Sequence, residues 1–110
     1  MQLSPSPVEI LVVVPAHNEE ETIGKTIESI QKAGLKTFGD LSSICVIVVC
    51  DSCTDSTEVV AKDRLSGTTS LVTSVSFRNV GMSRDHGVKL GLALHPHAFW
   101  IAFTDADTLV

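Results

Sequence analysis

The chain has 110 residues, of which 44% are hydrophobic and 19% charged, and its formal net charge is -5. This length allows one domain with a modest core, and the composition is that of an ordinary globular protein rather than a disordered one. The eight basic residues are scattered, which argues against a nucleic-acid surface because phosphate backbones are bound by clustered Lys and Arg.

No apolar run approaches the roughly 20 residues that cross a bilayer, and the first seven residues lack the pattern of a signal peptide. The three cysteines lie in one short segment and make a poor disulfide framework. We therefore expect a cytoplasmic protein without a transmembrane segment.

Short apolar runs alternate with amphipathic patterns along the chain. The first run, residues 8–14, reads as a buried strand that Pro15 ends, and the pattern over residues 19–33 predicts a helix that stops at Gly34. The remaining expected strands are residues 44–50, 70–77 and 98–103, and the remaining helices are residues 54–64 and 80–94. In the last helix, Val88 and Leu92 are expected to face the sheet.

This order, βαβαβαβ, predicts parallel strands joined by right-handed crossovers. The expected fold is a Rossmann-like, three-layer α/β/α domain with a mainly parallel sheet over residues 1–110. The alternation within residues 70–77 favours an edge position for that strand. Ligands of such sheets bind at the carboxyl ends of the strands, where the loops gather.

Each of the four loops expected at that edge carries polar residues with a recognisable chemistry. Asn18 and Glu19 can cap the first helix, and Asp51 can accept the imide N–H of uracil. Arg84 can pair with diphosphate oxygens, and the carboxylates of Asp105 and Asp107 suit Mn²⁺ or Mg²⁺. Taken singly, each motif also fits a capped turn or a solvated surface.

In this order the four loops resemble those of family 2 glycosyltransferases of the GT-A fold, over residues 8–107. The resemblance implies a site for a nucleotide-diphosphate sugar, UDP-sugar in particular, with a divalent metal and transfer of the sugar to an acceptor hydroxyl, with inversion expected. The nucleotide-binding residues that it implies are Pro15, Ala16, Asn18, Glu19, Asp51, Asn79, Gly81, Arg84 and Asp105, and the metal ligands are Asp105 and Asp107. His17 and Cys53 depart from the residues usual in the family.

In the family, the catalytic base and the acceptor site come from a segment downstream of the Asp-x-Asp motif. We therefore expect the domain to be incomplete, truncated at its C-terminus, and we name no catalytic residue. The family's fourth strand lies inside the sheet. Here its outer edge, near residues 99–103, is expected to be unpaired and apolar, which favours self-association.

Two other functions stay open at this point. The chain can be a nucleotide-binding module without turnover, or a truncated remnant of an enzyme. Alternatively, Cys50 and Cys53 form a Cys-x-x-Cys pair between a strand and a helix, a setting typical of thiol redox proteins.

Overall fold

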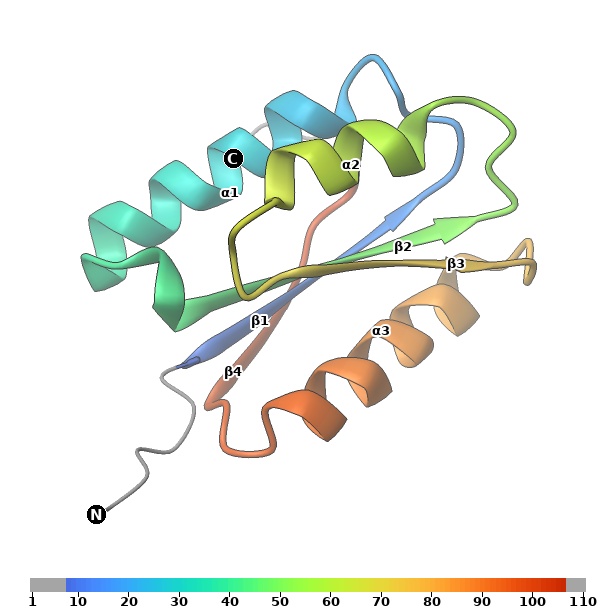
Figure 1. Cartoon of the computed structure of the whole chain (residues 1–110). Helices are drawn as coiled ribbons and strands as arrows, with labels where there is room; N and C mark the ends of the chain where they lie inside the picture. The colour runs from blue at the N-terminus through green and yellow to red at the C-terminus, as the bar shows by residue number, and fades with distance from the viewer. Residues whose placement is uncertain (1–7, 107–110) are drawn as a thin grey trace.

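The computed structural model describes residues 8–106 as an all-parallel sheet with helices on both faces (Figure 1). The elements in chain order are β1 (Ile10–Ala16), α1 (Ile23–Phe38), the 3₁₀ turn η1 (Leu41–Ser43), β2 (Ile44–Asp51), α2 (Thr57–Leu65), β3 (Leu71–Val75), α3 (Val80–Leu94) and β4 (Trp100–Phe103). The predicted order of strands and helices and the Rossmann-like α/β class are confirmed. Within residues 8–106, no helix combines the length and apolar character needed to span a membrane.

The strands lie in the order β3-β2-β1-β4, so the two most buried strands, β1 and β2, occupy the centre. Val12 of β1 is aligned with Val46 of β2 on one side and with Ala102 of β4 on the other. Every residue of β2 is buried, which explains its near-continuous run of β-branched residues. β3 lies at one edge, as its alternating pattern predicted, and β4 lies at the other edge of the described sheet.

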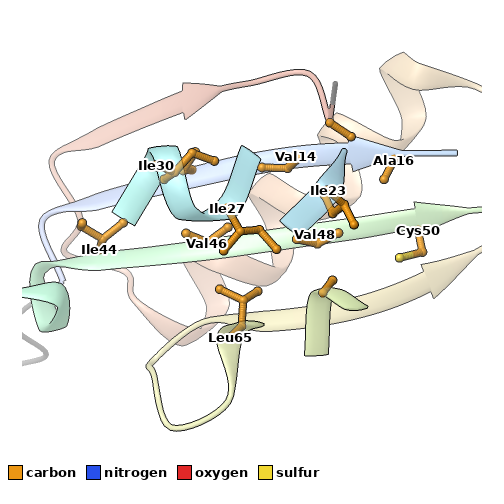
Figure 2. Close-up of a cluster of buried hydrophobic side chains, with 13 residues drawn as sticks. Val14, Ala16, Ile23, Ile27, Ile30, Ile44, Val46, Val48, Cys50 and Leu65 are labelled. Carbon is orange, nitrogen blue, oxygen red and sulfur yellow. The ribbon is translucent and has the colours of Figure 1, made fainter. Parts of the chain in front are cut away.

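Helices α1 and α2 cover one face of the sheet (Figure 1). Figure 2 shows Ile23, Ile27 and Ile30 of α1 lying against Val14 and Val46 of the central strands. The three isoleucines are buried at helical spacing, and full burial of such a side chain is worth about 2 kcal/mol. This packing fixes where α1 begins relative to the carboxyl ends of β1 and β2.

Helix α3 covers the opposite face and approaches it through small residues (Figure 1). Ser83, Gly87 and Gly91 are its buried positions, and a Cβ added to Gly87 would lie 2.5 Å from Cγ1 of Val13. Val88 packs beside the buried cluster as expected, whereas Leu92, predicted to face the sheet, is 37% exposed. The prediction for Leu92 was wrong because small residues, rather than large ones, form the contact face.

The predicted ends of the first helix at Gly34 and of the first strand at Pro15 were also wrong. Gly34 does not end α1: it is buried under Ile44, and the helix continues to Phe38, where Gly39 with a φ of 77° forms the left-handed C-cap. A glycine needed for close packing looks the same in sequence as a glycine that stops a helix.

Pro15 does not end β1, which runs on to Ala16. The carbonyl of Val13 accepts the N–H of Thr104 beyond β4, so Val13 faces that neighbour. Two residues on, Pro15 faces the same side, where the pairing with β4 has already ended. Its missing N–H therefore removes no bond from the sheet.

Candidate functional site

The loops after the strands surround two adjoining hollows at the carboxyl edge of the sheet. The larger, about 570 Å³ and called the large cleft here, is lined by His17, Asn18, Asp51, Ser52, Thr54, Arg78, Asn79 and Val80. The smaller, about 300 Å³ and called the small hollow, is lined by Pro15, Ala16, His17, Glu19, Asp51, Val80, Ser83, Asp105 and Ala106. The two share His17, Asp51 and Val80. All the predicted nucleotide-binding residues except Gly81 and Arg84 therefore line one hollow or both.

The carboxylate of Asp51 is the most densely bonded group of this region. Its Oδ1 accepts hydrogen bonds from the Arg78 N–H at 2.8 Å and the Ser52 hydroxyl at 3.0 Å. Its Oδ2 accepts from the Asn79 N–H at 2.9 Å and the Ser83 hydroxyl at 3.0 Å. Asp51 thus ties the end of β2 to the start of α3.

Two opposed effects act on the pKa of Asp51. Burial raises it, but the hydrogen bonds from Arg78, Asn79, Ser83 and Ser52 together outweigh burial and lower the pKa from 3.8 to about 2. A carboxylate has about four acceptor positions, and four donors of the chain occupy them. An imide N–H of a nucleobase has to replace one of these donors, and the Ser52 hydroxyl, which also lines the large cleft, is free to rotate away.

The loop after β1 is bonded to the loop after β2 through Asn18. The Asn18 Oδ1 accepts from the Thr54 N–H at 2.8 Å, the Asp55 N–H at 3.3 Å and the Thr54 hydroxyl at 3.4 Å. The Glu19 N–H donates to the hydroxyl of Thr57 at 2.8 Å. The predicted capping role was wrong: the N-cap of α1 is Thr22, without a side-chain cap bond, and Glu19 contributes its backbone carbonyl to the Ile23 N–H.

Backbone strain gathers in the same loops. Within the described chain, the non-glycine residues with positive φ are Asn18 at 50°, Ser52 at 56° and Arg78 at 51°. Asn tolerates this conformation, whereas Ser and Arg adopt it at a cost of about 1 kcal/mol. Each of the three follows a different strand at the edge that holds the clefts. Such strain typically concentrates at ligand sites, where surrounding bonds hold it in place.

The start of α3 and the end of β4 bring Arg84 and Asp105 together. The Arg84 Nη2 lies 3.4 Å from Asp105 Oδ1, and its guanidinium carbon lies 5.8 Å from the centre of the Phe103 ring. Asp85, the next residue in sequence after Arg84, pairs with Lys89 at 2.9 Å and not with Arg84. The Arg84–Asp105 pair is exposed, so an anion can compete for the guanidinium.

Asn79 and Gly81 belong to the N-terminus of α3. The Asn79 side chain caps the helix by accepting the Met82 N–H at 2.9 Å, and Gly81 lies exposed in the first turn. Helix N-termini favour anions. Gly81 therefore lies in a phosphate-compatible region, although it lines neither hollow.

Of the two predicted metal ligands, Asp105 belongs to the described residues. Asp105 is exposed beside the small hollow, and Asp107 lies outside the described residues. Among residues 8–106, no three or more His, Cys, Asp or Glu side chains cluster in a way that could hold an ion alone. Mg²⁺ and Mn²⁺ commonly take one or two carboxylates and complete their shell with phosphate and water, so an exposed Asp105 fits such an ion.

Of the two residues that depart from the family pattern, His17 lines both hollows and Cys53 lies behind them against the loop after β1. The Nδ1 of His17 is 2.8 Å from the backbone carbonyl of Asp51, which places the ring between the two hollows. The Cys53 Sγ accepts the Asn18 N–H at 3.4 Å and lies 3.6 Å from the Ala16 carbonyl. Burial, with Cys53 beside it, raises the pKa of Cys50 to about 12, so the Cys50 thiol stays protonated at neutral pH and is not itself a nucleophile.

Comparisons with known proteins identify the family and the fold. Residues 11–110 match the family described as glycosyl transferase family 2. An uncharacterized protein of Methanocaldococcus jannaschii is 43% identical over 54 residues, which are 49% of this chain and 19% of that protein.

The solved structures that resemble the fold include three of S. aureus TarS. The 1–349 fragment gives a TM-score of 0.71 at 22% identity, the fragment in complex with UDP 0.71 at 23%, and TarS itself 0.74 at 22%. The match covers 91% of this chain in each case but only 28%, 28% and 17% of the TarS chains. The chain therefore spans less than a third of the relatives it matches. The family match over residues 11–110 shows that this chain belongs to glycosyl transferase family 2.

Proposed function

We propose that this chain forms the donor-binding part of a glycosyltransferase and holds a nucleotide-diphosphate sugar, with UDP as the nucleotide. The observation that carries the proposal is the convergence of four loops at one sheet edge, with Arg84 and Asp105 paired beside the small hollow. Family membership and the UDP complex of S. aureus TarS support the choice of ligand.

In this proposal each loop has a distinct task. The guanidinium of Arg84 exchanges the carboxylate of Asp105 for diphosphate oxygens, aided by the N-terminus of α3. Asp51 accepts the imide N–H of uracil after Ser52 turns away, and the loop of Pro15, Ala16, Asn18 and Glu19 lines the nucleoside. Asn79 and Gly81 keep the backbone close to the phosphates.

Asp105 and Asp107 would hold Mn²⁺ or Mg²⁺, which would supply positive charge against the departing diphosphate. Transfer to an acceptor hydroxyl further requires a general base, for which the resemblance points downstream of Asp107. We therefore propose that the chain alone binds nucleotide weakly and transfers sugar poorly or not at all. In that state it acts as a nucleotide-binding module.

We also propose a cytoplasmic location, in keeping with the unpaired cysteines, and self-association through β4. Phe99, Trp100, Ile101 and Phe103 are all exposed at or beside this strand. β4 pairs with β1 alone in the described sheet, which leaves its outer backbone groups available to another strand.

The experiment that tests the proposal is calorimetric titration of UDP into the full chain, with and without Mn²⁺. Arg84→Ala and Asp107→Ala are each expected to weaken binding about tenfold, the loss of one charge-assisted contact. Lys89→Ala, also on α3 but paired with Asp85 on the surface, is the matched control and is expected to bind like the wild type. Absence of UDP binding by the wild type under both conditions would refute the proposed function.

A further inference from the structure

The turn that carries Asp105 is held by a buried hydrogen bond from helix α1. The hydroxyl of Thr26 on α1 donates to the backbone carbonyl of Ala106 at 2.7 Å, across 80 positions of sequence. Thr26 is fully buried and Ala106 is 3% exposed. A threonine inside a helix usually bonds a carbonyl of the preceding turn, so this outward bond is specific to the present packing.

Few other contacts hold this turn. The Thr104 N–H donates to the Val13 carbonyl at 3.1 Å, the last main-chain bond to the sheet among residues 8–106. Asp105 is anchored by its exposed pair with Arg84, and the methyl group of Ala106 packs in the cluster under α1. The Thr26 bond is therefore the one buried polar link between the turn and a helix in the described chain.

The bond from Thr26 holds Ala106, the neighbour in sequence of the predicted metal ligand Asp105. The Thr26 hydroxyl holds the backbone carbonyl of Ala106, and the planar peptide group between Asp105 and Ala106 joins this residue directly to Asp105. With the Ala106 side chain buried, the carboxylate of Asp105 is directed away from the core, where it is exposed. Groups that orient ligand-bearing segments affect metal affinity without touching the metal.

We infer that Thr26 is a positioning residue for the turn of residues 104–106 and, through Asp105, for the divalent metal that accompanies the nucleotide. The inference rests on the proposed function. It assigns to the buried start of α1 a share in metal binding that neither the four loop motifs nor the fold predicts.

The test compares Thr26→Val, which removes the hydroxyl and keeps the shape, with Thr26→Ser, which keeps the hydroxyl. Thr37→Val makes the same change at an exposed position of α1 and is the matched control. The first measurement is amide hydrogen exchange of the full chain without ligand. Exchange at residues 104–106 is expected to rise about tenfold in Thr26→Val and to stay near the wild-type rate in the other two variants.

The second measurement is UDP affinity with and without Mn²⁺. In Thr26→Val the gain in affinity brought by Mn²⁺ is expected to fall about tenfold, while the affinity without metal is unchanged and Thr26→Ser restores the gain. An equal loss with and without metal would indicate a purely structural role and overturn the inference, as would unchanged exchange at residues 104–106. A wild type that binds no UDP would refute the proposed function instead, and the exchange measurement would then still decide whether Thr26 holds the turn.

Discussion

Replacing Asp51 by asparagine tests whether its carboxylate holds the loops of the site together. Asn keeps the size of the side chain but replaces one acceptor oxygen with an N–H₂ group. That group would face two donors, either the Arg78 N–H and the Ser52 hydroxyl or the Asn79 N–H and the Ser83 hydroxyl. In the first of these orientations Arg78 would also lose the hydrogen bond that supports its positive φ.

The size of the effect follows from the pKa of Asp51. The folded chain lowers this pKa from 3.8 to about 2, and each pH unit between folded and unfolded values is worth about 1.4 kcal/mol. The ionised carboxylate therefore contributes about 2 kcal/mol to the free energy of unfolding. Because the folded pKa is the lower one, this contribution is fully present above about pH 4 and is lost as the pH falls toward 2.

The assay is urea unfolding of the wild type and Asp51→Asn, followed by circular dichroism at about pH 7 and about pH 3. At neutral pH the variant is expected to be less stable by about 2 kcal/mol, and the difference is expected to shrink as the pH falls. Asp63→Asn, an exposed aspartate of α2, controls for the loss of one charge. A difference that does not depend on pH, or one equal to that of Asp63→Asn, would refute the reasoning.

Two further predictions concern the packing of α3 on the sheet and association at the sheet's edge. Gly87→Ala is expected to lower the free energy of unfolding by about 1–3 kcal/mol, because its Cβ would lie 2.5 Å from Cγ1 of Val13. The control is Gly81→Ala, whose Cβ would meet only a side-chain oxygen at 3.3 Å and should not destabilise the protein. Thermal or urea unfolding measures both variants. At the edge, Ile101→Lys is expected to reduce concentration-dependent association in sedimentation, whereas Val59→Lys on the exposed side of α2 should leave it unchanged. A wild type that sediments as a monomer at high concentration would contradict the association proposal.

The strands were predictable because burial on both faces leaves a direct trace in sequence. The run of β1 is apolar throughout and that of β2 is apolar up to Cys50, and the shorter alternation of β3 marks its edge position. Helix α1 was predictable from the helical spacing of Ile23, Ile27 and Ile30. These signals come from side chains whose hydrophobicity and spacing depend little on the rest of the fold.

Contacts made by small residues or by the backbone could not be predicted from the sequence in this way. Ser83, Gly87 and Gly91 form the buried face of α3, yet a pattern of large apolar residues was expected there. Gly34 was expected to end α1, but it lies inside the helix and allows close packing against Ile44.

Within the site, the residue types of the four loops were predictable, but their bonding was not. Asp51 was recognised as a ligand-type carboxylate, whereas its four donors come from two loops and from α3, whose approach depends on the whole sheet. Thr26 carries no sequence signal for its partner 80 positions away.

The bonds of Asn18 have a consequence for the thermodynamics of ligand binding. One amide oxygen joins the loops after β1 and β2, so the wall that they form is ordered before any ligand arrives. The conformational entropy of this wall is lost during folding, and a nucleotide that enters loses mainly its own freedom. A variant without the Asn18 amide would have to order this wall when the nucleotide binds, so its entropy of binding would be more unfavourable even where every direct contact to the ligand is kept.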